Sequence, residues 1–247
     1  MIKFFRKIRQ KLLSENNFGK YLLYAVGEIL LVVIGILIAL QVNNWNESKK
    51  ISRQEIALIE NLKSEFKINL ENLEKVKVQN QVIYYCTNEL KSLIGQENSI
   101  INEHNVDSLL LNAILITDYQ PNQFVLSQLK TGEKLDIIKS EKLKKLLYEW
   151  DKALNGKTEA FNMLNTYFMN SLIPFLDENT SIRNVDLYGK YEWSNKTPLK
   201  YNSTNMFQLI QFDNRLENHI WNVNAFGNSI DTLITIAKKI EEEITKG

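Results

Sequence analysis

Apolar residues run almost unbroken through one N-terminal segment, and beyond it they return at helical spacing. The unbroken run covers 21–42, reads YLLYAVGEILLVVIGILIALQV and contains one charged side chain, Glu28. At about 1.5 Å per residue, a helix of this length crosses a hydrocarbon core of roughly 30 Å. The run is longer than the apolar region of a signal peptide and ends in Asn43 and Asn44 rather than at a small-residue cleavage site. The pattern predicts a retained transmembrane helix over 21–42.

Beyond this anchor, apolar residues form three seams with alternating steps of three and four, the spacing of helices that pack together. The seams lie in 59–94, 147–168 and 209–244. The second helix is expected to begin after the cap residue Ser140 and to end near Pro174, which has no N–H to donate. Polar residues stand at seam positions in all three helices: Asn69, Asn80, Lys157, Ser171 and His219.

Two shorter apolar pieces lie between the first and second seams, at 106–116 and 123–129. Pro121 separates them, and Gly132 follows them as a natural left-handed cap. Together they predict one broken helix.

Four helices joined in this order alternate in direction. We therefore predict an all-α fold, with an N-terminal transmembrane helix followed by an elongated antiparallel bundle of about four helices in 43–247. The connection 95–105 and the loop 174–204 are expected at one end of the bundle, and 132–139 with the C-terminus at the other.

Basic residues gather before the anchor. Residues 1–20 carry six Lys or Arg and one Glu, a net charge of +5, whereas the rest of the chain carries 24 basic and 28 acidic residues, a net charge of −4. Basic flanks stay in the cytoplasm, so the N-terminus is expected there and 43–247 outside it. The apolar residues of 1–20 recur every three or four positions. Residues 1–20 therefore form either a short amphipathic helix on the anionic inner leaflet, or a segment whose charges only set the topology.

Two stretches resemble a known family. The opening, MIKFFRKIRQKLLSENNFGKYLLYAVGEILLVVIGILIALQVNNWNE, and the middle stretch, LKTGEKLDIIKSEKLKKLLYEW, are similar to motifs of small single-pass proteins of flavobacteria and relatives. Their shared domain has no known function. The resemblance implies a bacterial inner-membrane protein with a periplasmic helical domain, and it carries over no catalytic or ligand-binding residues.

Glu28 is the most distinctive residue of the anchor. A charged carboxylate facing lipid would cost a few kcal/mol, so a compensating partner is expected. Helical steps from Glu28 reach Val32, Gly35 and Ala39, a stripe whose small pair Gly35-x-x-x-Ala39 permits close approach of another helix. We therefore expect this face to pack on a second membrane span, either a copy of this chain or a different protein. The alternative is a protonated or snorkelling Glu28 near the inner leaflet, hydrogen-bonded to Tyr24.

The loop 174–204 concentrates aromatic residues among polar ones. Aromatic side chains with polar groups supply large contact area in recognition surfaces. One interpretation is a partner-binding loop, and the other is a cap whose aromatics cover the end of the bundle. The residues expected to bind a partner are Tyr188, Tyr191, Trp193 and Tyr201.

Catalytic chemistry has little support in the sequence. The chain has two His and one Cys, and no nucleophile-elbow, metalloprotease or Cys-x-x-Cys motif. We predict no enzyme activity, no cofactor and no metal. Nucleic-acid binding is not expected either, because the domain after the anchor is acidic. A seam histidine, His219, is expected to be hydrogen-bonded rather than to sense pH.

Three functional hypotheses follow. The preferred one is a scaffold or accessory subunit of an envelope complex, whose partners are the lipid bilayer, another membrane span and a periplasmic protein. The alternatives are a periplasmic ligand-sensing bundle that works with a partner, and a proton-coupled, stator-like subunit that uses Glu28.

Overall fold

The computed structural model describes residues 18–132, 134–189 and 195–246. Within these ranges the chain forms helices, turns and irregular segments, and no strand. It divides into two compact units, Met1–Ala57 and Leu58–Gly247. The predicted all-α class, with a long N-terminal helix followed by packed helices, is confirmed.

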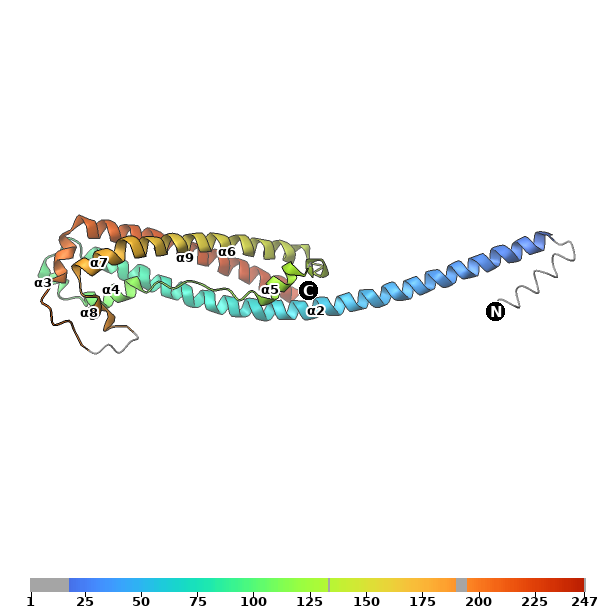
Figure 1. The fold of residues 1–247 in the computed structure, drawn as a ribbon, viewed down its shortest axis with the longest axis horizontal. Helices are drawn as coiled ribbons and strands as arrows, with labels where there is room; N and C mark the ends of the chain where they lie inside the picture. Colours follow the sequence, from blue (N-terminus) through green and yellow to red (C-terminus); the bar gives the residue numbers. More distant parts are fainter. Residues whose placement is uncertain (1–17, 133, 190–194, 247) are drawn as a thin grey trace. The chain divides into compact units, whose positions relative to one another are not determined.

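The first unit contains the apolar part of α2 (Phe18–Ser92), which is drawn in blue in Figure 1. From Leu22 to Val42 no side chain of this helix is buried. Among the described helices, α2 is the one long and apolar enough to cross a membrane by length and composition. A helix that is apolar on every side is normally buried, yet the other described residues do not cover this segment.

The second unit is built around three long helices: α2 beyond Leu58, α6 (Glu141–Tyr167) and α9 (Ile210–Lys246). They lie side by side in Figure 1, and α9 runs antiparallel to the other two. Ser140 caps α6 as predicted, because its Oγ accepts from the Leu143 N–H at 3.1 Å.

The two ends of the bundle are the predicted ones. At one end, the N–H of Gly95 donates to the C=O of Phe207 at 2.9 Å, which joins the first connection to the start of α9. At the other end, Ser140 donates to Glu243 near the C-terminus at 2.8 Å.

Two short helices and a non-helical segment occupy the position of the expected fourth helix. Helix α4 (Val106–Ile114) and helix α5 (Phe124–Thr131) are both short, and the nine residues between them, 115–123, are not helical. We call residues 115–123 the strap. Figure 1 shows it as a green trace stretched along the bundle between α4 and α5. The prediction of one broken helix is therefore wrong in its middle part, although both flanking pieces are helical.

Pro174 does not end the second helix. After α6, a π-helical turn, η2 (Phe168–Leu172), leads directly into α7 (Ile173–Asn179), with Pro174 in its first turn. A proline removes one helical N–H and leaves a carbonyl one turn earlier without its usual partner. Arg215 of α9 donates to the C=O of Ser171 at 3.2 Å, so α9 stabilises the irregular turn from outside.

The segment predicted as the loop 174–204 also has structure. It contains most of α7 and all of α8 (Ile182–Asp186), and it leads into the 3₁₀ helix η3 (Ser203–Gln208). The remaining short helices are α3 (Asn98–Ile101) and the 3₁₀ helix η1 (Lys134–Ile137).

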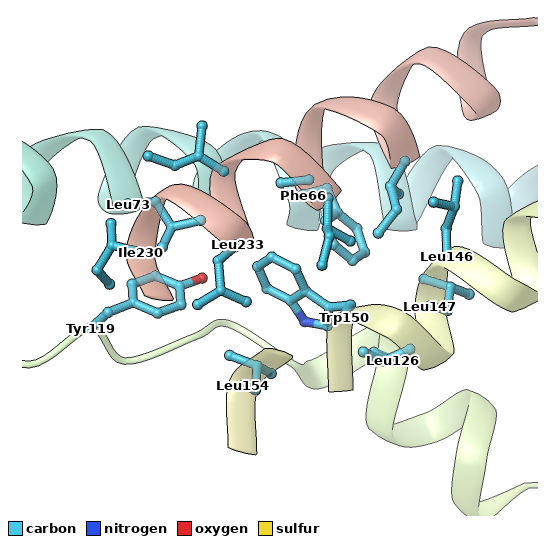
Figure 2. Close-up of a cluster of buried hydrophobic side chains, with 14 of the residues drawn as sticks. Phe66, Leu73, Tyr119, Leu126, Leu146, Leu147, Trp150, Leu154, Ile230 and Leu233 are labelled. Atoms are coloured by element: carbon cyan, nitrogen blue, oxygen red, sulfur yellow. The ribbon is translucent and has the colours of Figure 1, made fainter. Parts of the chain in front are cut away.

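Two apolar clusters fill the bundle. In the first, Phe66 of α2 meets Trp150 of α6 edge to face, with ring centroids 5.0 Å apart. Figure 2 shows Tyr119 reaching from the strap toward Ile230 and Leu233 of α9. The strap thus closes one side of this core.

The second cluster lies at the end that holds α4, α7 and α8. There Phe212 of α9 stacks on Phe175 at 5.4 Å and meets Phe207 edge to face at 5.2 Å. The aromatic contacts therefore fasten α7 and η3 to the start of α9.

Candidate functional site

Buried polar side chains from three helices converge on the main chain around the strap. Asn69 of α2 is fully buried and bonds the main chain of Asn122 twice. Its Oδ1 accepts from the N–H at 2.8 Å, and its Nδ2 donates to the C=O at 2.8 Å. The same Oδ1 accepts from the Tyr119 hydroxyl at 2.9 Å. A neighbouring antiparallel strand would pair with the N–H and the C=O of Asn122 in the same way. The Asn69 amide therefore takes the place of such a strand.

Glu65 holds the end of the strap where α5 begins. Its carboxylate is buried and accepts from the N–H of Val125 at 2.7 Å and from the N–H of Leu126 at 3.2 Å. The first N–H groups of a helix have no partner within the helix, and its positive end favours a carboxylate. Burial raises the pKa of Glu65 above its usual value of 4.5, and the main-chain hydrogen bonds lower it in part.

Lys157 holds the middle of the strap from α6. Its ammonium group donates to Asp118 Oδ1 at 2.8 Å and to the C=O of Tyr119 at 2.9 Å. The Lys157 side chain is 5% exposed and that of Asp118 is 22% exposed, so the ion pair is mostly removed from water. Burial also raises the pKa of the Tyr119 hydroxyl, which stays protonated and donates to Asn69.

His219 of α9 is fully buried and binds the last turn of α4. Its Nε2 lies 2.9 Å from the C=O of Ala113. Because a carbonyl can only accept, Nε2 carries the proton, and Nδ1 is left buried without a described hydrogen-bond partner. Burial lowers the pKa of His219. The expectation of a hydrogen-bonded seam histidine is confirmed.

Asn80 performs a similar task between α2 and α9. Its Nδ2 donates to the C=O of Val223 at 3.1 Å. The contact needs a glycine on α9, because a Cβ built on Gly227 would lie 2.6 Å from Asn80 Nδ2. Four of the five polar interruptions of the seams, all except Ser171, thus hold main-chain groups of other elements.

An open groove of about 500 Å³ lies beside the strap. Its walls carry two ion pairs, Asp118 with Lys157 and Lys130 with Asp151. The rest of the lining is mixed and consists of Gln120, Pro121, Gln123, Leu154, Asn155 and Thr158. The groove has the chemistry to hold a small polar molecule of either charge.

The predicted intramembrane stripe lies on one face of α2. Val32, Gly35 and Ala39 are exposed and Glu28 is half-buried. A Cβ built on Gly35 would meet nothing within 4 Å, so this face leaves room for a neighbouring helix. A shallow groove of about 350 Å³ runs along Ala25, Glu28, Ile29, Val32 and Val33. The packing of the stripe against a second span stays a prediction.

The predicted partner-binding aromatics are only partly described. Tyr191 and Trp193 lie outside the described residues. Tyr188 is 46% exposed and Tyr201 is 42% exposed, and the Tyr201 hydroxyl accepts from Asn184 at 2.7 Å.

Neighbouring apolar residues of the same segment behave as a cap. Phe175, Leu176 and Val185 are buried in the second core cluster. The segment therefore combines a buried cap with two half-exposed tyrosines. Partner binding by these tyrosines stays a prediction.

Some of the network was not visible in the sequence. The seam positions of Asn69 and Lys157 marked them as unusual, but nothing local indicated that both reach the strap. Glu65, Asp118 and Tyr119 carried no signal, because their roles depend on contacts between residues 39 to 61 positions apart. Within the described residues no group of three or more His, Cys, Asp or Glu is placed to hold a metal ion.

These observations define an all-helical protein with a candidate membrane helix and a bundle braced by buried main-chain hydrogen bonds. Residues 28–123 match the model of a family of unknown function, DUF6090. The predicted resemblance to an uncharacterised family is confirmed over these residues, and its occurrence in flavobacteria stays a prediction. The match begins at Glu28 and ends where the strap ends, so it includes Asn69. No curated protein and no solved structure matches the chain.

Proposed function

We propose that this protein is a membrane-anchored scaffold or accessory subunit of a bacterial envelope complex. In this proposal the apolar part of α2 crosses the inner membrane, residues 1–20 stay in the cytoplasm, and residues 43–247 lie in the periplasm. The main support is that the most deeply buried polar side chains of the bundle are occupied with holding its own main chain.

This use of polar side chains fits a structural role. Asn69, Glu65 and Lys157 each make at least two hydrogen bonds to the strap or the start of α5. A fully satisfied buried network favours one fixed arrangement, because any displacement leaves polar groups without partners. A bundle of this kind is suited to presenting a fixed surface to other proteins.

The stripe on α2 supplies the second part of the proposal. The open space beside Gly35 permits the close approach that small residues provide between membrane helices. A second span packed here would also shield Glu28 from lipid. The occupant is either a second copy of this chain or another membrane protein.

Cysteine crosslinking in native membranes tests this proposal. In a Cys86→Ala background, single cysteines at Gly35 and Ala39 should form adducts with a second span. Leu30 and Leu37 lie about half a turn away from the stripe and serve as matched controls. Affinity purification of the crosslinked product would then identify the partner. Equal adducts at all four positions, or none, would contradict the proposal.

The groove beside the strap favours a second candidate function, a ligand-sensing bundle that works with a partner. Mass spectrometry of small molecules that co-purify with the intact protein would test it, with Gln123→Leu as the groove variant. For the stator-like alternative, Glu28→Gln should abolish function while leaving assembly intact. A scaffold should either tolerate Glu28→Gln or lose its assembly.

A further inference from the structure

The end of the apolar run of α2 carries an arrangement that is not explained by helix formation. Lys49 places its ammonium group 3.7 Å from the centre of the Trp45 ring. Among the described carboxylates none forms an ion pair with Lys49, whereas the adjacent Lys50 lies 3.8 Å from Glu47. The two neighbouring lysines are therefore in different situations, one held over an aromatic ring and the other beside an acid.

A pocket of about 440 Å³ lies at the same place. It is lined by polar side chains that can donate hydrogen bonds and by two apolar ones: Gln41, Asn44, Ser48, Val42 and Trp45. It begins where the apolar run ends, so one side of it continues the apolar surface and the other side is polar. A phospholipid headgroup has the same division between its phosphate and its glycerol and acyl carbons.

We propose that this pocket binds the phosphate of an anionic phospholipid headgroup, of the phosphatidylglycerol type, in the periplasmic leaflet, where α2 leaves the membrane after Val42. The inference rests on the proposed membrane span. A phosphodiester requires a cation and neutral hydrogen-bond donors. Lys49 supplies the cation, and Gln41, Asn44 and Ser48 supply donors. The Trp45 ring keeps the Lys49 ammonium beside the pocket and packs against the glycerol region.

Charge complementarity selects this occupant over a neutral lipid. Lys49 and Arg53 stand one helical turn apart on the face of Trp45. An anionic headgroup gains from both, whereas phosphatidylcholine carries its own cation and gains less.

The test measures lipid selectivity of the full-length protein in phosphatidylcholine bilayers. Trace spin-labelled phosphatidylglycerol or phosphatidylcholine is added, and electron spin resonance gives the fraction of each that is immobilised at the protein. Lys49→Gln and Trp45→Leu should lower the preference for phosphatidylglycerol by about threefold to fivefold. Trp45→Phe retains an aromatic ring and should keep most of the preference.

Lys50→Gln is the matched control, because it removes the same charge one position away. The proposed site predicts a much smaller change for Lys50→Gln than for Lys49→Gln. Equal changes in the two variants would show a general surface-charge effect and overturn the site. An unchanged preference in Lys49→Gln would overturn it as well.

Two further measurements distinguish a lipid phosphate from free phosphate, and a failure of the proposed pocket from a failure of the proposed membrane span. Free phosphate would compete for the same donors, so at equal ionic strength inorganic phosphate should lower the preference more than sodium chloride does. Equal effects of the two salts would show no phosphate-specific site and overturn the proposal. Inorganic phosphate that binds the wild-type protein but not Lys49→Gln, while both immobilise phosphatidylglycerol equally, would assign the pocket to free phosphate and overturn the lipid site. A protein that immobilises no lipid at all, and that alkaline washing removes from vesicles, would refute the membrane span itself.

Discussion

Asn69 offers the most direct perturbation of the strap. Asn69→Ala removes three hydrogen bonds at once, two to the main chain of Asn122 and one to the Tyr119 hydroxyl. We expect the variant to release the strap while leaving the three long helices in place.

The magnitude follows from where each partner lies. Asn122 is exposed, so water can replace Asn69 there, and the net loss is about 1 kcal/mol for each of the two bonds. Tyr119 is 1% exposed, and its hydroxyl would be left buried without a partner, which costs a further ~1–3 kcal/mol. The free energy of unfolding should therefore fall by about 3–5 kcal/mol.

Two measurements check this value. Guanidinium unfolding of the full-length protein in detergent, followed by circular dichroism, gives the change in stability. Hydrogen exchange with mass spectrometry should show faster exchange in 115–126 and little change in α9. Asn88→Ala is the matched control, because the Asn88 side chain donates to the Tyr84 carbonyl of its own helix and not to the strap.

A double-mutant cycle isolates the buried hydroxyl. Tyr119→Phe removes the group that Asn69→Ala would strand, so the double variant should be less destabilised than the two single variants added together. If Asn69→Ala costs no more than Asn88→Ala and leaves exchange in the strap unchanged, the side chain does not hold the strap and the reasoning is wrong.

The remaining predictions use the same unfolding measurement. Lys157→Met should cost about 3–6 kcal/mol, from about 1.5–3 kcal/mol for each of the two charged hydrogen bonds lost, whereas Lys145→Met at an exposed pair should cost less than about 0.5 kcal/mol. Gly227→Ala should cost about 1–2 kcal/mol by overpacking, and should cost nothing in an Asn80→Ala background, where the contacting amide is absent. Because burial lowers the pKa of His219, the unfolded state binds more protons than the native state. Stability should therefore fall as pH decreases from about 7 to about 5, and His219→Gln should remove that part of the decline.

The long helices were predictable because each carries its own periodic pattern. The seams in 59–94 and 209–244 contain enough repeats to identify the buried face without knowledge of the neighbours. Ser140 was recognisable as a cap for the same reason, since its partner Leu143 is three residues away.

The strap was not predictable from local pattern. The apolar run 106–116 reads as helix to its end, yet α4 stops at Ile114. The carbonyls on either side of this point accept from distant side chains, Ala113 from His219 and Leu115 from Gln79 at 3.4 Å. Such non-local bonds override helix propensity, and they are not encoded in the spacing of the residues that adopt the irregular form.

Pro174 illustrates the same limit. The rule that proline ends a helix rests on its missing N–H and its steric clash. Here a π-helical turn precedes the proline, and the neighbouring carbonyl of Ser171 accepts a hydrogen bond from Arg215, which lies 44 residues away along the chain. The candidate membrane helix, by contrast, was predictable because length and composition alone define a candidate, although its continuation to Ser92 without a break was not.

The central claim is that the apolar part of α2 spans the membrane and places the bundle in the periplasm. Dual topology reporters fused after Gly247 test it most directly, with alkaline phosphatase, which is active only when exported, and green fluorescent protein, which is fluorescent only in the cytoplasm on this export route. The account predicts an active phosphatase and a dark fluorescent fusion. A fluorescent fusion with an inactive phosphatase would contradict it.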